Sequence, residues 1–403
     1  MTVRVDGERL LFELNELGRI GRNESGGYDR MAFSQSDLQG RTLVEGFMRD
    51  AGMTVVRDAA FNSVGLYPGN EDLPPITVGS HTDTVPGGGN YDGVLGVLSG
   101  IACVRALNAA GLCLRHPVEV INFTGEEAVA PGGTFGSRLM TGAFEDRLLD
   151  QTVYSGQSFA ELLTSAGVDL AQIRSIERKK GEVAAYVELH IEQGGILDER
   201  GIPAGVVDGI VGFRRYAVVF RGVANHAGTT PMNQRDDALL KATPFINAVQ
   251  AVAIRHGIVG TVGTVKVLPN APNVIPDEVA LTFELRGLDD AVLDAAEGEL
   301  RQVAKKAEAT VDRYSCKPPI ISDATLVRAL ASGCESASLQ FIRMPSGAGH
   351  DANLMARICP IAMLFVPNKD GISHSKDEYT SPENCINGAV ALLHGLLAID
   401  AAI

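Results

Sequence analysis

The sequence lacks the features that mark several large classes of protein. No stretch of its 403 residues approaches the roughly 18 consecutive apolar residues that a membrane-spanning helix needs. Residues 1–21 mix charged and apolar side chains, without the unbroken apolar segment and small-residue cleavage site of a signal peptide. We therefore expect a cytoplasmic protein with no membrane partner.

Cysteine pairs and an excess of basic residues are also absent. The six cysteines are scattered, with no CxxC pair and no closely spaced framework, which favours reduced thiols that take part in packing. Lysine and arginine number 35 against 49 acidic residues, which gives a net charge of -14. Because nucleic-acid binding relies on clustered basic residues, this balance argues against a polyanion partner.

The first half of the chain has the pattern of an α/β sheet. Residues 76–79 and 118–123 are apolar and read as buried strands, and residues 95–109 have helical apolar spacing. Ser36 is a candidate N-cap for a helix that continues through Met48. Alternation of strands and helices predicts a central sheet flanked by helices.

A second pattern interrupts the first. From residue 212 the order is strand, helix, two strands, helix and strand, which predicts a self-contained βαββαβ unit. Residues 361–366 and 384–397 then return to a strand and a closing helix. We therefore expect a discontinuous α/β domain (1–211 and 328–403) with an inserted α+β domain (212–327).

A histidine and two aspartates flank a glycine-rich turn in the segment GSHTDTVPGGGNYDG. His81 ends an apolar strand and Asp83 follows two residues later, so both side chains project from the same side and the carboxylate can orient the imidazole. The glycines at 87–89 allow a turn that returns Asp92 to the same point, where a carboxylate can bridge two cations. This cluster predicts a metal site.

Two adjacent glutamates, Glu126 and Glu127, follow the strand at 118–123. In a turn their side chains diverge, so that one can bind a metal while the other holds a metal-bound water. Taken alone, the pair fits a solvated surface charge pair better. Beside the first cluster, it predicts a proton-transfer residue next to a ligand.

Two further histidines complete a set of candidate ligands. His190 lies in ELHIEQG, whose alternation predicts a strand with one exposed polar face, and His374 follows the strand at 361–366. Ligands in open α/β sheets bind at the carboxyl ends of strands. Nitrogen and oxygen donors suit Zn, Mn, Co or Ni, and five ligands are too many for one catalytic ion. The sequence therefore predicts two divalent metal ions that share Asp92, with the ligands His81, Asp92, Glu127, His190 and His374.

Arg286 lies in the inserted unit and has no place in the ligand set. A guanidinium can hold a substrate carboxylate in a bidentate manner. A surface ion pair with Glu284 is an equally good interpretation of the residues alone.

The chain resembles one enzyme group through motifs that follow one another in unbroken order from about Arg30 to Ser381. The group contains N-carbamoyl-L-amino-acid hydrolases, β-ureidopropionases and allantoate amidohydrolases, within the larger family of co-catalytic metallopeptidases that includes aminoacylases. The motifs are GSHTDTVPGGGNYDG, TGEE, ELHIEQG, NHAGTTPM, PNAPNVIP, SGAGHDA and GISHSKDEYT.

The resemblance implies a role for each motif. One ion is expected between His81, Asp92 and His190, and the other between Asp92, Glu127 and His374. Glu126 is expected to act as general base, with Asp83 orienting the imidazole of His81. The insert is expected to be a dimerisation domain of a homodimer, in which His226 stabilises the oxyanion and in some relatives enters the partner's active site. The expected substrate contacts are Gln193, His226, Asn273, Arg286, Gly349 and His350.

Three positions depart from the pattern of the group. Relatives commonly carry an Arg shortly after the paired glutamates, where this chain has Ala128–Gly133. They often have Gly-Asn and a nearby Arg in place of Phe61–Leu66, and Asp in place of Glu284. The first departure lies beside the predicted metals and bears on the identity of the substrate. Arg286 is retained, so a substrate carboxylate is still expected.

We expect metal-dependent hydrolysis of a carbamoyl or amide C–N bond in a small carboxylate-bearing substrate, first of all an N-carbamoyl-L-amino acid. In this hypothesis a water bridging the two ions gives its proton to Glu126 and attacks the polarised carbonyl. His226 stabilises the oxyanion, and Glu126 returns the proton to the leaving nitrogen. The alternatives are an allantoate- or ureidoglycolate-type amidohydrolase, an N-acyl amino acid amidase or dipeptidase, and a non-enzymatic scaffold, which a missing base or ligand would favour.

Overall fold

A computed structural model of the protein describes residues 3–127 and 131–403. The chain divides into two compact units, of which unit 1 is Met1–Gly209 with Ser322–Ile403 and unit 2 is Ile210–Ile321. The return to unit 1 therefore comes before the predicted residue 328. It does so because α9 (Ala324–Ser336) packs against α11 (Pro382–Ala402), which closes unit 1.

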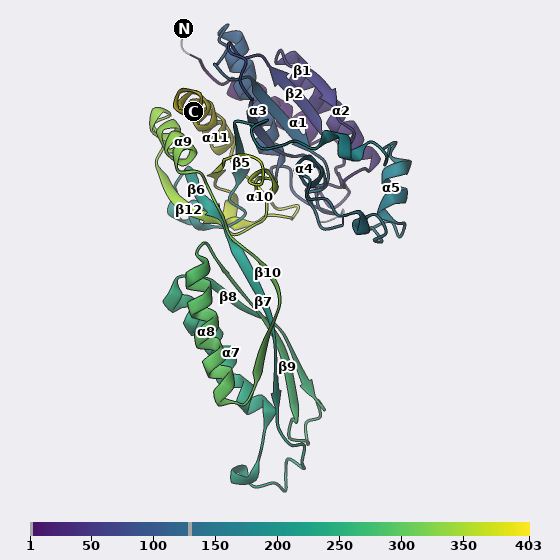
Figure 1. The fold of residues 1–403 in the computed structure, drawn as a ribbon, viewed down its shortest axis with the longest axis vertical. Coiled ribbons are helices and arrows are strands. Elements are labelled where there is room, and N and C mark those ends of the chain that lie inside the picture. Colours follow the sequence, from purple (N-terminus) through teal and green to yellow (C-terminus); the bar gives the residue numbers. More distant parts are fainter. Residues whose placement is uncertain (1–2, 128–130) are drawn as a thin grey trace. The chain divides into compact units, whose positions relative to one another are not determined.

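Unit 1 is built on a mixed sheet of nine strands (Figure 1). The strands are β1 (Thr54–Arg57), β2 (Ser63–Tyr67), β3 (Ile76–His81), β4 (Val118–Phe123), β5 (Ala185–Ile191), β6 (Ala204–Ile210), β11 (Ile320–Ile321), β12 (Phe341–Ser346) and β13 (Ile361–Val366). Their order is β1-β2-β4-β3-β5-β13-β6-β11, and β12 pairs with β6. The central strands β4, β3, β5 and β13 run parallel, so their carboxyl ends lie at one edge of the sheet.

Helices cover this sheet, and one of them begins earlier than predicted. The side chain of Ser34, and not that of Ser36, accepts the N–H of Asp37 and caps the helix, whereas the Ser36 hydroxyl donates to the carbonyl of Asp29. The cap prediction was wrong because both serines stand at the same turn and only the backbone path decides between them. The capped helix is α2 (Gln35–Asp50). The other helices of unit 1, besides α9 and α11, are α1 (Gly7–Leu17), α3 (Val94–Ala109), α4 (Phe135–Met140), α5 (Phe159–Ser165), α6 (Ile196–Arg200) and α10 (Ala352–Met355).

α11 is long and apolar enough to cross a membrane by length and composition. The expectation that no segment approaches this limit is therefore wrong for residues 382–402. The helix packs against α3 and α9, and its residues Leu392, Leu396 and Ile399 are completely buried in the core of unit 1. Its apolar character is thus accounted for by packing.

Unit 2 is a four-stranded antiparallel sheet with two helices (Figure 1). Its elements are β7 (Gly212–Arg221), α7 (Ala238–His256), β8 (Val259–Leu268), β9 (Glu278–Gly287), α8 (Asp290–Lys306) and β10 (Thr310–Lys317). The βαββαβ order and the α/β class of the whole chain are confirmed. Alternate side chains of β9 are buried against the helices, which gives this unit its own core, whereas β8 is a largely exposed edge strand.

Candidate metal centre

The predicted ligands meet at the carboxyl edge of the parallel strands. His81 is the last residue of β3, and His190 lies near the end of β5, which pairs with β3. Glu126 and Glu127 follow β4, and His374 follows β13. A strand end places a side chain beyond the hydrogen-bonded sheet, where polar groups of neighbouring strands converge.

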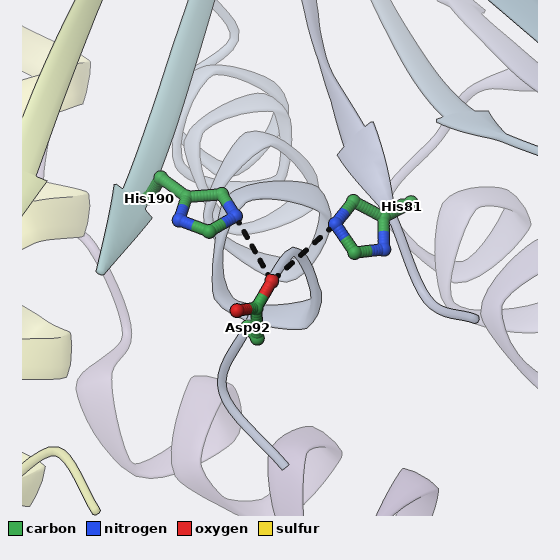
Figure 2. Close-up of side chains that lie close together, drawn as sticks. All are labelled: His81, Asp92 and His190. Atoms are coloured by element: carbon green, nitrogen blue, oxygen red, sulfur yellow. Dashed lines mark ion pairs between the residues drawn. The ribbon is translucent and has the colours of Figure 1, made fainter. Parts of the chain in front are cut away.

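The first group is formed by His81, Asp92 and His190. One carboxylate oxygen of Asp92, Oδ1, lies 3.2 Å from Nε2 of His190 and 3.5 Å from Nε2 of His81. Figure 2 shows the two imidazoles directed at this oxygen from adjacent strands. All three side chains are buried, so the group is shielded from competing water.

The second group uses the other oxygen of the same aspartate. Nε2 of His374 lies 3.5 Å from Asp92 Oδ2 and 3.3 Å from Glu127 Oε1. His374 is 48% exposed and has a positive φ of 53°, so it closes the group from the solvent side. Asp92 therefore belongs to both groups, with one oxygen facing each.

Hydrogen bonds at Nδ1 of two imidazoles direct Nε2 of each ring toward Asp92, and Nε2 of His190 also accepts the N–H of Gly93 at 3.1 Å. Nδ1 of His81 lies 3.0 Å from the carbonyl of Asp83, and Nδ1 of His190 lies 2.9 Å from the carbonyl of Ile191. Because a carbonyl only accepts, each Nδ1 carries a hydrogen and each neutral ring presents the Nε2 lone pair. This is the tautomer that binds a metal through Nε2.

The spacing within both groups fits a shared cation. Two ligand atoms about 2.1 Å from one ion at a tetrahedral angle lie about 3.4 Å apart. The four distances to Asp92 and Glu127 range from 3.2 to 3.5 Å. Imidazole nitrogens with carboxylate oxygens are a donor set that suits first-row divalent ions.

The electrostatics also favour a cation at this place. Burial raises the pKa of Glu126 well above its usual range and that of Glu127 to about 8, and other carboxylates nearby add to both shifts. Burial opposes a charge on His81, but Glu126 and Asp92 raise the pKa of this imidazole well above its ordinary value. Without a metal, bound protons therefore offset the negative charge of these carboxylates. A divalent cation at the same place would supply that positive charge instead.

Asp83 acts differently from the prediction. Its carbonyl contacts the His81 imidazole, whereas its carboxylate oxygen Oδ1 is 3.9 Å from His81 Nδ1. The carboxylate instead accepts the backbone N–H groups of Gly125, Glu126 and Glu127 at 3.2, 3.4 and 3.1 Å. Asp83 therefore holds both the imidazole, through its main chain, and the glutamate turn, through its side chain.

β5 is buried on both faces, so the predicted exposed polar face is wrong. The polar side chains of this strand are satisfied internally. Glu188 accepts the hydroxyls of Ser80 and Tyr186 and the N–H of Ala352. Glu188 also lies within reach of His190 and His350, and its bonds to Ser80 and Ala352 tie β5 to the neighbouring segments of the site.

Three predicted substrate contacts lie in unit 1. Gln193 has a φ of 59°, which directs its side chain back so that Nε2 donates to Asp92 Oδ2 at 2.6 Å. Its buried Oε1 has no hydrogen-bond partner among the described residues. His350 is buried, with its ring centre 4.7 Å from that of His190, and Gly349 before it is exposed.

The other three lie in unit 2. His226 and Asn273 are exposed on adjoining segments, where Ala227 donates its N–H to the Asn273 carbonyl at 3.0 Å. Nδ1 of His226 accepts the N–H of Gly228 at 3.0 Å, so the neutral ring carries its hydrogen on Nε2. Arg286 lies on β9 and forms an ion pair with Glu284, as the alternative to a substrate contact predicted.

Sequence reasoning missed two residues that contact Asp92. Ser373 places its hydroxyl 2.7 Å from Asp92 Oδ2, and Glu378 accepts the N–H of Asp92 at 3.1 Å. Both stand in the motif GISHSKDEYT. The acidic residue four positions after His374 is Glu378, and its place in this motif was the one signal that could have pointed to it. In the unusual segment Ala128–Gly133, residues 128–130 lie outside the described residues.

Comparison with known proteins agrees with this geometry. Residues 77–398 match peptidase family M20/M25/M40. The chain is 39% identical over 399 residues to an N-carbamoyl-L-amino acid amidohydrolase of Geobacillus stearothermophilus, covering 97% of this chain and 98% of that protein. A ureidoglycolate hydrolase of Arabidopsis thaliana is 36% identical over 409 residues, with 97% of this chain and 86% of that protein covered.

A solved structure extends the comparison to the fold. A hydantoinase/carbamoylase family amidase from Burkholderia ambifaria superposes with a TM-score of 0.90 at 35% identity, covering 99% of this chain and 98% of that one. Unit 2 is the dimerisation-type domain of this family. The chain is a hydrolase acting on C–N bonds, and it belongs to the hydantoinase/carbamoylase amidohydrolase group of the M20 family.

Proposed function

We propose that this protein hydrolyses the carbamoyl C–N bond of an N-carbamoyl-L-amino acid, using two divalent ions of Zn, Mn, Co or Ni. The observation that carries the proposal is the pair of ligand groups sharing Asp92, with Glu126 beside them: its Oε2 lies 3.7 Å from His81 Nε2. The ions, when bound, would polarise the substrate carbonyl and lower the pKa of a water.

The protein's own residues would move the proton. Glu126 is the carboxylate next to the ligand Glu127, and its burial favours the protonated form that a general base must reach during the reaction. Oε2 of Glu126 would take the proton from the attacking water and give it to the leaving nitrogen. His226, with hydrogen on Nε2, would donate to the oxyanion, and Arg286 would bind the substrate carboxylate.

Gln193 and His350 are proposed to contact the ureido group of the substrate. The Oε1 atom of Gln193 is an acceptor without a described partner, beside Asp92, and would accept an N–H of the carbamoyl group. Burial lowers the pKa of His350 well below its ordinary value, so this imidazole is neutral at physiological pH and suits contact with an uncharged substrate group.

Substrate profiling tests the proposal. Metal-loaded protein is incubated with N-carbamoyl-L-amino acids, β-ureidopropionate, allantoate, ureidoglycolate and N-acyl amino acids, and ammonia is measured beside the amino product. Ammonia from N-carbamoyl-L-amino acids is the expected result. The similarity to a ureidoglycolate hydrolase makes ureidoglycolate the second candidate, and turnover of N-acyl substrates without ammonia would contradict a carbamoyl scissile group.

We also propose a homodimer formed through unit 2, in a cytoplasmic location. The edge strand β8 exposes its backbone and the apolar side chains of Val259 and Val265, which suits pairing with a second copy. Light scattering should give twice the mass of one chain, and Val265→Lys should lower it. A monomer at micromolar concentration would refute the dimer, and recovery outside the cytoplasmic fraction would refute the location.

A further inference from the structure

A buried carboxylate outside the ligand set lies against the loop that carries Asp92. Glu378 follows β13 in the segment between His374 and α11. It is only 6% exposed, and although the charge of Arg30 acts on it, no lysine or arginine of the described residues forms a salt bridge with it. Burying an unpaired carboxylate costs stability, so its position calls for a reason other than stability.

The contacts of Glu378 converge on Asp92 from two directions. Oε1 accepts the backbone N–H of Tyr91 at 2.8 Å and that of Asp92 at 3.1 Å. Oε2 lies 3.1 Å from the hydroxyl of Ser373, which is also 2.7 Å from Asp92 Oδ2. Glu378 thus holds the main chain of Asp92 directly. Through Ser373 it also contacts one carboxylate oxygen of Asp92.

The glycine-rich turn is shaped to admit this carboxylate. A Cβ built on Gly89 would lie 2.0 Å from Oε1 of Glu378, far inside contact distance. No other residue type fits at position 89 while Glu378 keeps its bonds. The next backbone N–H along the turn, that of Gly93, points at His190 Nε2 at 3.1 Å, the atom that would bind the first ion. With that ion bound, the two bonds to Glu378 would be the ones that hold this part of the turn.

We propose that Glu378 is a positioning residue that sets the Asp92 carboxylate between the two ligand groups. This rests on the proposed two-metal function. Because Asp92 belongs to both groups, loss of Glu378 should weaken the binding of both ions. Supporting hydrogen bonds of this kind contribute about 10- to 100-fold to metal affinity.

The experiment is a calorimetric titration of metal-free protein with Mn or Zn, beside thermal unfolding of the same samples. Glu378→Ala is expected to lower the affinity for both ions by about 10- to 100-fold. Glu378→Gln should recover most of it, because the amide oxygen still accepts both backbone N–H groups. Ser373→Ala, a milder change at the same link, should shift affinity in the same direction by less.

Asp323 supplies the matched control. It accepts two backbone N–H groups at 2.8 and 3.1 Å, as Glu378 does, but at the start of α9. Asp323→Ala should lower the unfolding temperature and leave metal affinity unchanged. Wild-type metal affinity in Glu378→Ala would overturn the role of Glu378. If that variant does not fold, wild-type metal affinity in Ser373→Ala would do so. An equal loss of metal affinity in Asp323→Ala would also overturn it. Wild-type protein that binds no divalent ion would overturn the proposed function as well.

Discussion

Replacing Asp83 by Asn tests how the glutamate turn is held. The two oxygens of Asp83 accept three backbone N–H groups, from Gly125, Glu126 and Glu127, and Oδ1 lies 3.6 Å from the guanidinium of Arg41. Asparagine has one acceptor oxygen, so its NH₂ must face at least one of these N–H groups. Losing one charge-assisted bond and leaving its N–H buried should cost about 3 kcal/mol.

The functional effect should exceed the effect on stability. A shift of about 1 Å in a catalytic group can lower a rate about 100-fold, and Glu126 lies on the turn that Asp83 holds. We therefore expect kcat for ammonia release to fall about 100-fold, with weaker binding at the ion near Glu127. The ion between His81, Asp92 and His190 should keep its affinity, because the Asp83 carbonyl that orients His81 is unchanged.

The assay combines kcat, KM and metal titration on folded protein. Asp37→Asn is the control, since Asp37 pairs with the same Arg41 at 2.9 Å and accepts the N–H of Phe33, away from the turn. It should lower stability and leave kcat near that of wild type. An Asp83→Asn enzyme with kcat within about threefold of wild type would contradict the role of the Asp83 carboxylate in holding the glutamate turn. Equal loss of both ions would show that the carboxylate acts through His81.

Three further predictions follow from the site. Glu126→Gln should retain both metals while kcat falls by at least about 100-fold, since a general base contributes at least that much; near-normal activity with metals bound would sink the assignment. Arg286→Ala should raise KM for carboxylate substrates about 10- to 100-fold, from a charge-assisted bond of about 1.5–3 kcal/mol, and an unchanged KM would remove its anchoring role. In metal-free protein, burial raises the pKa of Glu127 to about 8 and that of Glu378 to about 7 from 4.5. The folded state therefore retains protons that the unfolded state loses, so the unfolding temperature should fall as pH rises from about 5 to 8. A rise over this range would contradict these shifts, and added divalent metal should restore stability at pH 8.

Local patterns in the sequence predicted the parts of the fold that depend on apolar spacing. β4 and β13 begin and end at the predicted residues, and the βαββαβ order of unit 2 is as expected. Because both strands end at the same edge of the sheet, Glu127 and His374 were expected to lie near one another, and the structure places them 3.3 Å apart. Periodicity failed for β5, because its alternating polar residues are buried and bonded inside the protein instead of facing solvent.

Contacts between segments far apart in the chain could not be predicted from the sequence. Glu378 contacts the N–H of Asp92 across 286 residues, and no spacing rule connects the two. The carboxylate of Asp83 was expected at His81 because the residues are two apart in a strand. The chain leaves β3 after His81, so that carboxylate turns toward the backbone of the glutamate turn. Such assignments depend on the path of the main chain.

Ammonia release by chelated and reconstituted protein shows whether hydrolysis depends on two bound metal ions. Protein stripped of metal should release no ammonia from N-carbamoyl-L-amino acids, and activity should return as two equivalents of Mn, Co, Ni or Zn bind per chain. The recovered activity should differ among these ions, because both ligand groups contain imidazole and carboxylate donors. Undiminished ammonia release from protein shown to contain no metal would contradict the account.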